Sequence, residues 1–167
     1  MNITFRKMTV EDISAVVELD RKSFSLPWPE RSFRFELTEN PASRCWVAEL
    51  DGHIVGMIVV WLIVDEAHVA TIATDPQYRR QGIGKRLLAH ALRELIDDGA
   101  RSSFLEVRET NLAAQDMYRK FGYEATGRRR HYYRDNDEDA LLMTLDSLNA
   151  ERLLVEERST KGAQNER

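Results

Sequence analysis

Hydrophobic and polar residues follow one another in patterns that predict strands and helices along most of the chain. Residues 45–50 and 53–64 are strand-like on either side of Asp51-Gly52, a dipeptide typical of a tight hairpin turn. Over residues 83–96, apolar side chains recur every three or four positions, which predicts an amphipathic helix that ends at Gly99. We therefore expect an antiparallel hairpin, followed by a helix that packs on a core.

The same reasoning predicts the flanking elements. Thr9 followed by Asp12 resembles a capping box that opens a helix, and Pro29 is well placed to start a second helix. Asn111 can cap a later helix that Gly122 ends. Further strands are predicted at residues 3–5, 69–74, 103–107, 123–133 and 140–145, the last two flanking a polar turn at 135–137.

The length of the chain favours one domain. With 167 residues, 43% of them apolar, the chain can build a real core but not two domains of ordinary size. We expect the domain to span residues 1–147. After Leu145 the sequence becomes charged, so residues 148–167 are expected to form a flexible tail.

The charge balance argues against a nucleic-acid partner. Lys and Arg number 24 against 28 Asp and Glu, so the net charge is −4 and any basic site must be local. The segment 128–134 is basic with interleaved aromatic residues, a composition that can grip single-stranded RNA. On an acidic chain, a solvated hairpin face or a dock for an acidic peptide is the preferred interpretation.

Three features that the sequence lacks limit the compartment and the partners expected for the protein. Cys45 is the only cysteine, which excludes an internal disulfide framework and favours a reducing compartment, the cytoplasm. The four histidines show no paired ligand spacing, so no metal site is predicted. The longest apolar run, residues 54–64, is much shorter than the roughly 20 residues that a membrane-spanning helix needs, so no membrane partner is expected.

A glycine-containing loop at residues 79–85 carries the main chemical signal. Its two glycines allow a ligand to approach the backbone closely, and the following helix points its positive end at the same place. This predicts a pyrophosphate cradle. The loop lacks the spacing of a P-loop and the third glycine of a dinucleotide fingerprint, for which Leu87 stands instead. A simple strand-to-helix turn with a solvated basic rim is the alternative.

The pattern that remains, Arg-x-x-Gly-x-Gly, closely resembles the acyl-CoA loop of the GCN5-related N-acetyltransferases. Downstream, Leu105-Glu106-Val107-Arg108 is followed by Asn111-x-x-Ala114-x-x-x-Tyr118-x-x-x-Gly122-Tyr123 at the separation expected in that superfamily. With residues 72–76, the match covers Val69 to Tyr123. Residues 24–28, 105–108 and 129–133 look like the ribosomal-protein alanine N-acetyltransferases, although His131 stands in place of an Asn and residues 71–74 depart modestly from that group's pattern.

This resemblance implies a mixed α/β fold with a mostly antiparallel sheet, helices on both faces, and a V-shaped split between two central strands that holds acetyl-CoA. By the same resemblance, one strand edge takes the pantetheine arm and the thioester oxygen, the glycine loop takes the pyrophosphate, and one helix cap touches CoA. The implied residues are Ile72, Ala73 and Thr74 for the strand edge, Arg80, Gln81, Gly82, Ile83, Gly84 and Lys85 for the loop, and Asn111 for the cap.

Two catalytic roles follow from the family motif. Glu106, a carboxylate in an apolar strand, is expected to deprotonate the substrate amine, and Tyr118 resembles the family's general acid for the departing thiolate. Each has a plain alternative: Glu106 as an ion-pair partner of a nearby Arg such as Arg108 or a strand-end residue facing water, and Tyr118 as a core aromatic.

The substrate is expected to be the N-terminal α-amine of a protein. Its pKa of about 7.7 to 8.0 suits a weak base better than the value of about 10.4 for lysine. By resemblance, Leu26 and Trp28 face Tyr132 and Tyr133 across the entrance, and the target is an Ala or Ser terminus of a ribosomal protein; ordinary packing is the alternative for each side chain. Two alternative functions stay open: acetylation of lysine or of a small-molecule amine, and a non-catalytic acyl-CoA-binding module.

Overall fold

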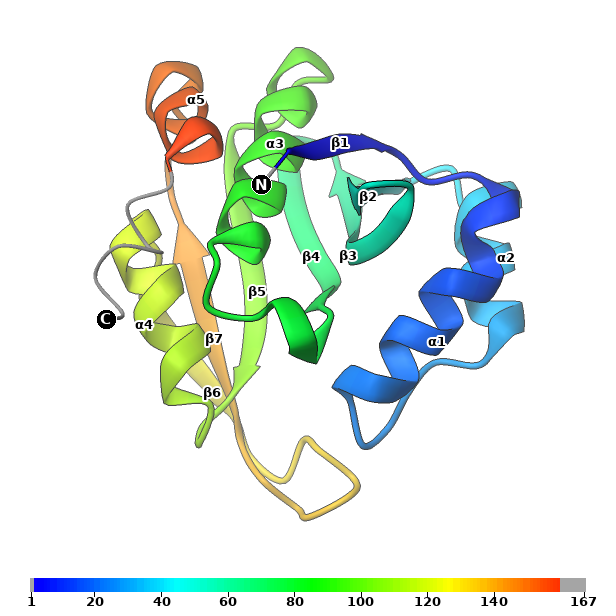
Figure 1. The fold of residues 1–167 in the computed structure, drawn as a ribbon. Coiled ribbons are helices and arrows are strands. Elements are labelled where there is room, and N and C mark those ends of the chain that lie inside the picture. Colours follow the sequence, from blue (N-terminus) through cyan, green and yellow to red (C-terminus); the bar gives the residue numbers. More distant parts are fainter. Residues whose placement is uncertain (1, 160–167) are drawn as a thin grey trace.

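The computed structural model describes residues 2–159, in which seven strands form one sheet of order β1-β2-β3-β4-β5-β7-β6 (Figure 1). Neighbouring strands are antiparallel, except that β4 and β5 are parallel. The predicted mixed, mostly antiparallel sheet is confirmed. The strands are β1 Ile3–Lys7, β2 Ser43–Leu50, β3 His53–Ile63, β4 Glu66–Thr74, β5 Ser102–Arg108, β6 Glu124–Arg129 and β7 Ala140–Leu145.

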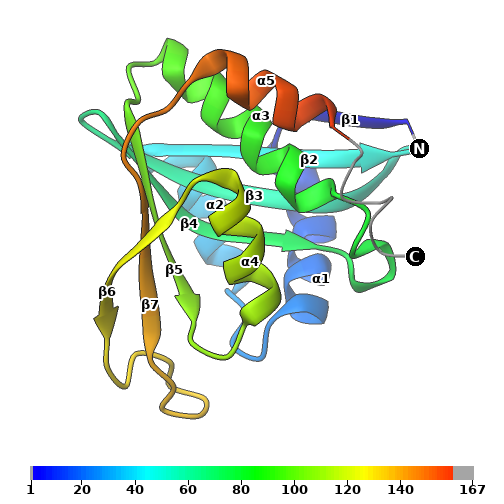
Figure 2. The same ribbon diagram turned by 90° about the vertical axis from the view of Figure 1, so that its left-hand side faces the viewer.

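Helices cover both faces of the sheet, with α1 and α2 on one side and α3, α4 and α5 on the other (Figure 2). Each side has its own apolar cluster: Phe33 belongs to the first, Leu88 and Tyr123 to the second. None of these helices is long and apolar enough to cross a membrane. Their bounds are α1 Ile13–Ser23, α2 Glu30–Thr38, α3 Ile83–Asp97, α4 Leu112–Phe121 and α5 Ala150–Arg158, with 3-10 turns at Val10–Asp12 and Pro76–Tyr78.

The sheet splits between β4 and β5. These strands pair only from Glu66 to His68 on β4 and from Ser102 to Phe104 on β5. Beyond that point the strands diverge, as Figure 2 shows, and residues 69–74 pair with β3 alone. The predicted V-shaped split is therefore present, and one edge of β4 faces it without a partner strand among residues 2–159.

Several local predictions are confirmed. Asp51 and Gly52 form the β2–β3 turn, both with positive φ. The Thr9 amide donates to the Asp12 carboxylate at 2.8 Å in the predicted capping box. The Asn111 side chain accepts a hydrogen bond from the Ala114 amide at 3.2 Å, and Gly122 ends α4 in a left-handed conformation.

Two segments differ from expectation. The predicted strand 123–133 ends at Arg129, because His131 has a positive φ and its amide bonds to the Asp139 carboxylate rather than to a neighbouring strand. In the expected flexible tail, residues 150–158 form α5, which packs along α3 (Figure 1). Residues 160–167 of that tail lie outside the described residues.

Helix α5 is held by both apolar and polar contacts. Leu153 is buried, and the Glu157 carboxylate accepts hydrogen bonds from His90 Nδ1 and Arg93 Nε, each at 2.7 Å. The Arg86 Nε donates to the backbone carbonyl of Glu157, also at 2.7 Å. The charged sequence of α5 therefore does not prevent this helix from packing on α3, because Glu157 has hydrogen-bond partners there.

Candidate active site

The loop before α3 has the geometry of an anion site. Gly82 is the N-cap of α3 in a left-handed conformation, φ 76° and ψ 9°, which an L-residue adopts only at a cost of about 1 to 2 kcal/mol. Gly82 has no side chain with which to cap this end of α3, and no other side chain within residues 2–159 caps it. The first amides of the helix have no intrahelical acceptor, so they and the helix dipole offer positive charge to a ligand.

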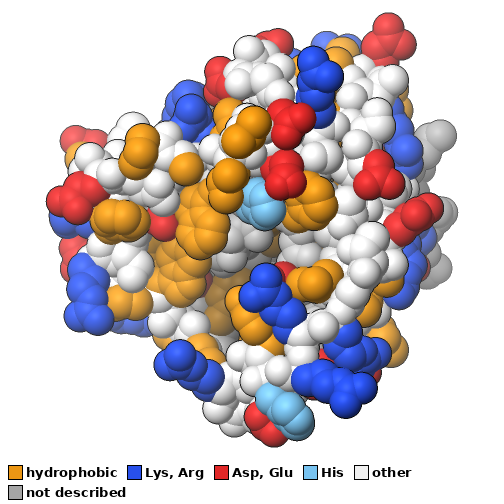
Figure 3. Space-filling model, turned by 180° about the vertical axis from the view of Figure 1, so that it is seen from behind, with side chains coloured by type: hydrophobic (Ala, Val, Ile, Leu, Met, Phe, Trp, Pro, Cys, Tyr) orange, Lys and Arg blue, Asp and Glu red, His pale blue; other side chains and the backbone are white. Residues whose placement is uncertain are grey.

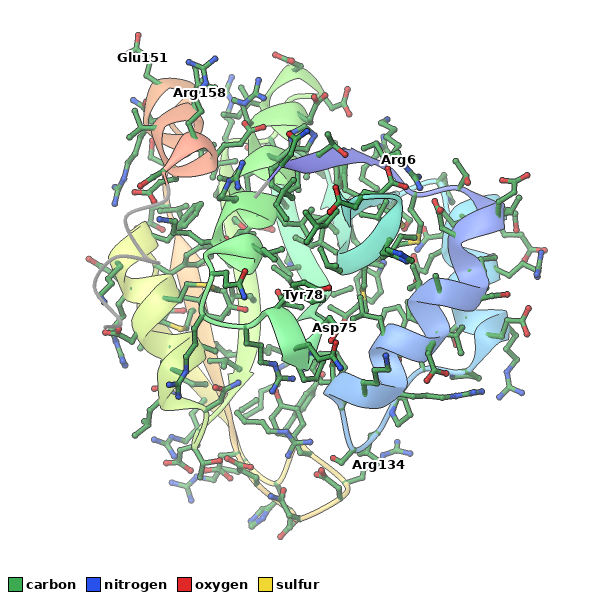
Figure 4. The ribbon with its side chains drawn as sticks, in the orientation of Figure 1. Arg6, Asp75, Tyr78, Arg134, Glu151 and Arg158 are labelled. Carbon is green, nitrogen blue, oxygen red and sulfur yellow. The ribbon has the colours of Figure 1, made fainter. Side chains whose placement is uncertain are left out.

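The loop lies against the open end of β4. A Cβ atom on Gly84 would stand 3.2 Å from Thr74 Oγ1, so the absence of a side chain permits this close approach. Figure 4 labels Asp75 and Tyr78 in the connection between β4 and α3, at the mouth of the split. Ile72, Ala73 and Thr74 pair with β3 on one side and leave their other edge toward the split.

Side chains in the loop contribute unequally. Arg80 is exposed and has a positive φ, whereas the Ile83 side chain is buried in the core, so Ile83 can offer a ligand only its backbone. Lys85 Nζ lies 3.5 Å from the Glu156 carboxylate on α5. The Lys85 ammonium is thus already paired, a contact that the sequence did not suggest.

Glu106 projects from β5 on the face opposite the α3–α4 core. Along β5, Ser103, Leu105 and Val107 are buried, and the residues between them face the other way. The Glu106 Oε1 lies 3.2 Å from Arg129 Nε, and the carboxylate raises the pKa of the nearby Tyr132 hydroxyl. The alternative of an ion pair with a nearby Arg is therefore present, but the partner is Arg129, because Arg108 binds the carboxylates of Asp135 and Glu138.

Tyr118 is buried on α4, and its ring meets Tyr123 edge-on at 5.7 Å between centroids. Burial, with a smaller contribution from Tyr133, raises the pKa of Tyr118, so its hydroxyl stays protonated through the neutral range. Among the described residues, this hydroxyl has no hydrogen-bond partner, whereas the Tyr123 hydroxyl donates to Ser103 at 2.7 Å. The Tyr118 ring packs in the core, as the alternative expected, and no group within residues 2–159 accepts a hydrogen bond from its hydroxyl.

Two loops close the far end of the site. The Ser25 hydroxyl, between α1 and α2, donates to the Asp135 carboxylate between β6 and β7. Leu26 is exposed on the first loop and Tyr132 on the second, while Trp28 packs on Phe33 at 5.3 Å. The Ser25–Asp135 hydrogen bond therefore joins the two loops that carry the predicted walls, and Figure 4 labels Arg134, which belongs to the second loop.

Tyr133 is the best anchored residue of these walls. The Arg108 guanidinium lies over its ring at 3.9 Å, and the Tyr132 ring meets it edge-on at 5.1 Å. Burial raises the pKa of Tyr133 to about 12. Tyr133 is thus the more buried part of the wall, while Tyr132 is more exposed and has its hydroxyl beside the Glu106 carboxylate.

A shallow hollow adjoins this entrance on the α2 side. It has a volume of about 370 Å³ and is lined by Trp28, Arg31, Ser32, Phe35, Glu36 and Trp61. Figure 3 shows apolar side chains gathering around the centre of this face. The Glu36 carboxylate accepts from Trp61 Nε1 and Asn40 Nδ2, both at 2.9 Å, so the floor of the hollow is fixed.

Sequence reasoning missed Arg129, Asp135, Glu138 and Glu156 as members of the site. Arg129 stands in a run of three arginines, and nothing local distinguishes it from its neighbours. Only the pairing of β6 with β7, and of β7 with β5, brings it to Glu106. Glu156 was assigned to the tail.

Comparison with known proteins identifies the family of the chain. The model of the acetyltransferase (GNAT) family matches residues 13–123. A Bacillus subtilis protein provisionally named a ribosomal protein bS18-alanine N-acetyltransferase is 44% identical over 138 residues, covering 83% of this chain and 91% of the relative.

Solved structures agree in fold. The Escherichia coli ribosomal-protein-S18-alanine N-acetyltransferase superposes with a TM-score of 0.80 at 31% identity, covering 89% of this chain and 96% of that one. Arabidopsis thaliana NAA60, solved in complex with acetyl-CoA, gives a TM-score of 0.76 at 18% identity, covering 86% and 98%. The second similarity concerns the fold alone.

Proposed function

The chain belongs to the GNAT family of acetyltransferases, and on that premise we propose that it transfers acetyl from acetyl-CoA to the N-terminal α-amine of a ribosomal protein. An Ala or Ser terminus is the expected acceptor, and the cytoplasm is the expected compartment. The observation that carries the proposal is the split between β4 and β5, which leaves one edge of β4 free next to the uncapped N-terminus of α3. Tyr133 lies near both candidate catalytic groups, because, besides burial, Tyr133 raises the pKa of Tyr118 and the Glu106 carboxylate raises the pKa of Tyr133.

The cofactor is proposed to lie along the split. Amides at Gly82, Ile83, Gly84 and Lys85 would hold the pyrophosphate, assisted by Arg80 and Gln81, because uncapped helix amides bind anions. Ile72, Ala73 and Thr74 would bond the pantetheine arm with their free edge, and Asn111 would add a contact beside its capping role. Lys85 is assigned through its backbone, since Glu156 already holds its ammonium.

The chemistry requires the α-ammonium to lose two protons on the way to an amide, and the sulfur to gain one. Glu106 is proposed to take the proton from the α-ammonium, directly or through water, as the nitrogen attacks the thioester carbonyl. An amide on the β4 edge would stabilise the developing oxyanion. The C–S bond then breaks, and Tyr118 gives its proton to the departing thiolate; its raised pKa keeps that proton in place until then. The second proton, which the nitrogen loses as the amide forms, would restore the Tyr118 hydroxyl, directly or through water.

The walls are proposed to receive the peptide terminus. Leu26 and Trp28 lie on one side, and Tyr132 and Tyr133 on the other, with Ser25 and Asp135 joining the two loops. The names of the similar proteins, which are ribosomal-protein alanine N-acetyltransferases, favour a protein substrate over the small-molecule alternative.

Mass spectrometry of two matched peptides tests the proposal. One peptide begins with Ala and contains an internal Lys; the other is identical but already acetylated at its α-amine. We expect one acetyl group on the α-amine of the first and none on the second. Modification of Lys in both peptides would support the lysine alternative, and CoA binding without turnover on either would support the non-catalytic module.

A further inference from the structure

The proposed base is occupied by a cation from its own chain. Arg129 Nε lies 3.2 Å from Glu106 Oε1, with side chains 58% and 27% exposed. Beyond this carboxylate, the Arg129 guanidinium is near only the Tyr132 ring among the described residues, at 5.7 Å from the ring centroid. A positive charge therefore sits where a substrate ammonium must come.

The register of the sheet explains why this arginine reaches the base. Glu106 pairs with Leu142, and Leu142 pairs with Gly127, so the position across β7 from Glu106 carries no side chain on β6. In the adjacent row, Ala140 stands between Arg108 and Arg129, and a small buried residue there leaves room above it. Residues opposite one another share a face of the sheet, so Arg129 can reach Glu106 diagonally.

The other arginines near this row are held elsewhere. Arg108 is bound to Asp135 and Glu138 and covered by the Tyr133 ring. Arg128 pairs with Glu109 and Asp139. Within residues 2–159, Arg129 is the arginine that contacts Glu106, and its side chain is exposed.

A guanidinium cannot serve as a proton donor or acceptor at any ordinary pH. While Arg129 lies beside Glu106 Oε1, it fills the position that a substrate ammonium would need in order to contact that oxygen. Exposed ion pairs of this kind are weak, so a substrate ammonium can displace the arginine at small cost.

From this we propose that Arg129 is an internal competitor of the substrate amine for Glu106, a positioning residue that yields to the incoming α-ammonium and returns after acetylation. The product amide carries no charge, so re-pairing of Arg129 with Glu106 favours product departure. This inference rests on the proposed role of Glu106 as the base.

Steady-state kinetics on Arg129→Gln tests the competition, with Arg130→Gln as the matched control. Arg130 is exposed and makes no ion pair within residues 2–159. With an Ala-starting peptide and saturating acetyl-CoA, Arg129→Gln is expected to lower the peptide KM by about two- to fivefold, the range that a weak surface ion pair allows, with kcat within about twofold. The control should match the wild type in both.

A KM for Arg129→Gln that equals or exceeds that of the wild type would overturn the inference, as would a large fall in kcat. The proposed function fails by a different result, namely no acetyl group on the α-amine of the Ala-starting peptide with the wild-type protein. The base role of Glu106 fails if Glu106→Gln keeps full activity, so these failures are distinguishable from that of the inference.

Nuclear magnetic resonance of the Arg129 Nε–H group gives a readout that needs no turnover. Titration with the Ala-starting peptide should shift this signal as the pair with Glu106 opens, whereas the α-acetylated peptide should not. Equal shifts with both peptides would contradict the displacement of Arg129 by charge.

Discussion

Replacement of Tyr118 by Phe separates catalysis from packing. The Tyr118 hydroxyl makes no hydrogen bond among residues 2–159, so its removal keeps the ring and breaks no bond within the fold. We expect the free energy of unfolding to change by less than about 0.5 kcal/mol. The matched variant is Tyr123→Phe, because the Tyr123 hydroxyl donates to the fully buried Ser103 at 2.7 Å. Its loss should cost about 1 to 2 kcal/mol.

The two variants should behave in opposite ways. Thermal denaturation should show almost no change in Tm for Tyr118→Phe, but a fall of about 2 to 8 °C for Tyr123→Phe. Turnover with saturating acetyl-CoA and peptide should fall by about 100-fold for Tyr118→Phe, the lower range for loss of a general acid, and stay near the wild-type rate for Tyr123→Phe below its melting range.

Binding calorimetry with CoA completes the test. Tyr118→Phe should keep its CoA affinity, since the proposed proton is needed only as the C–S bond breaks. Wild-type turnover in Tyr118→Phe would show that the residue is a packing aromatic alone. A large loss of stability in that variant would show that its hydroxyl has a partner within the fold.

Three further outcomes are expected. Gly82→Ala and Gly99→Ala each place a side chain at positive φ, at opposite ends of α3 and with open space around it, so melting curves should show a loss of about 1 to 2 kcal/mol in the free energy of unfolding for both. Calorimetry should show weaker CoA binding only for Gly82→Ala. Equal CoA affinities would show that Gly82 is not part of the pyrophosphate site. Burial opposes ionisation of Glu157, but its hydrogen bonds to Arg93 and His90 outweigh burial and lower its pKa below the ordinary 4.5. Glu157→Gln should therefore lose about 1 to 2 kcal/mol of unfolding free energy at pH 7, and this loss should shrink as the pH falls below 4.5. An equal loss at pH 3 and pH 7 would contradict the pairing. Glu106→Gln should lower kcat/KM most at pH values below the amine pKa of about 8, where a proton must be removed, and parallel pH profiles would exclude Glu106 as the base.

Local signals in the sequence were enough to predict most elements. Asp51-Gly52 requires a tight turn whatever surrounds it, and Asn111 and Gly122 specify the two ends of α4 through their own side-chain and backbone properties. The periodicity of α3 is equally local, because its apolar face must be buried somewhere. The turn, the helix ends and the helix periodicity appear in the structure as predicted because they depend on neighbouring residues and little on tertiary contacts.

Features that depend on distant partners could not be predicted. Helix α5 is stable because Leu153 and Glu157 have partners on α3, which a charged sequence read alone does not reveal. Arg129 meets Glu106 only through two strand registers, whereas Arg108, two residues from Glu106, is drawn away by Asp135 and Glu138. The roles of the loop and strand-edge residues toward CoA stay predictions.

The central claim is that backbone amides around Gly82 and Gly84 hold the pyrophosphate of CoA and aim its thioester at Glu106 and Tyr118. An amide-resolved titration with CoA, set against pantetheine as a comparator that lacks the pyrophosphate, tests this most directly. The account predicts that CoA shifts the amide signals of residues 82–85 and 72–74, and that pantetheine shifts only those of 72–74. Saturable CoA binding that leaves residues 82–85 unchanged would contradict it.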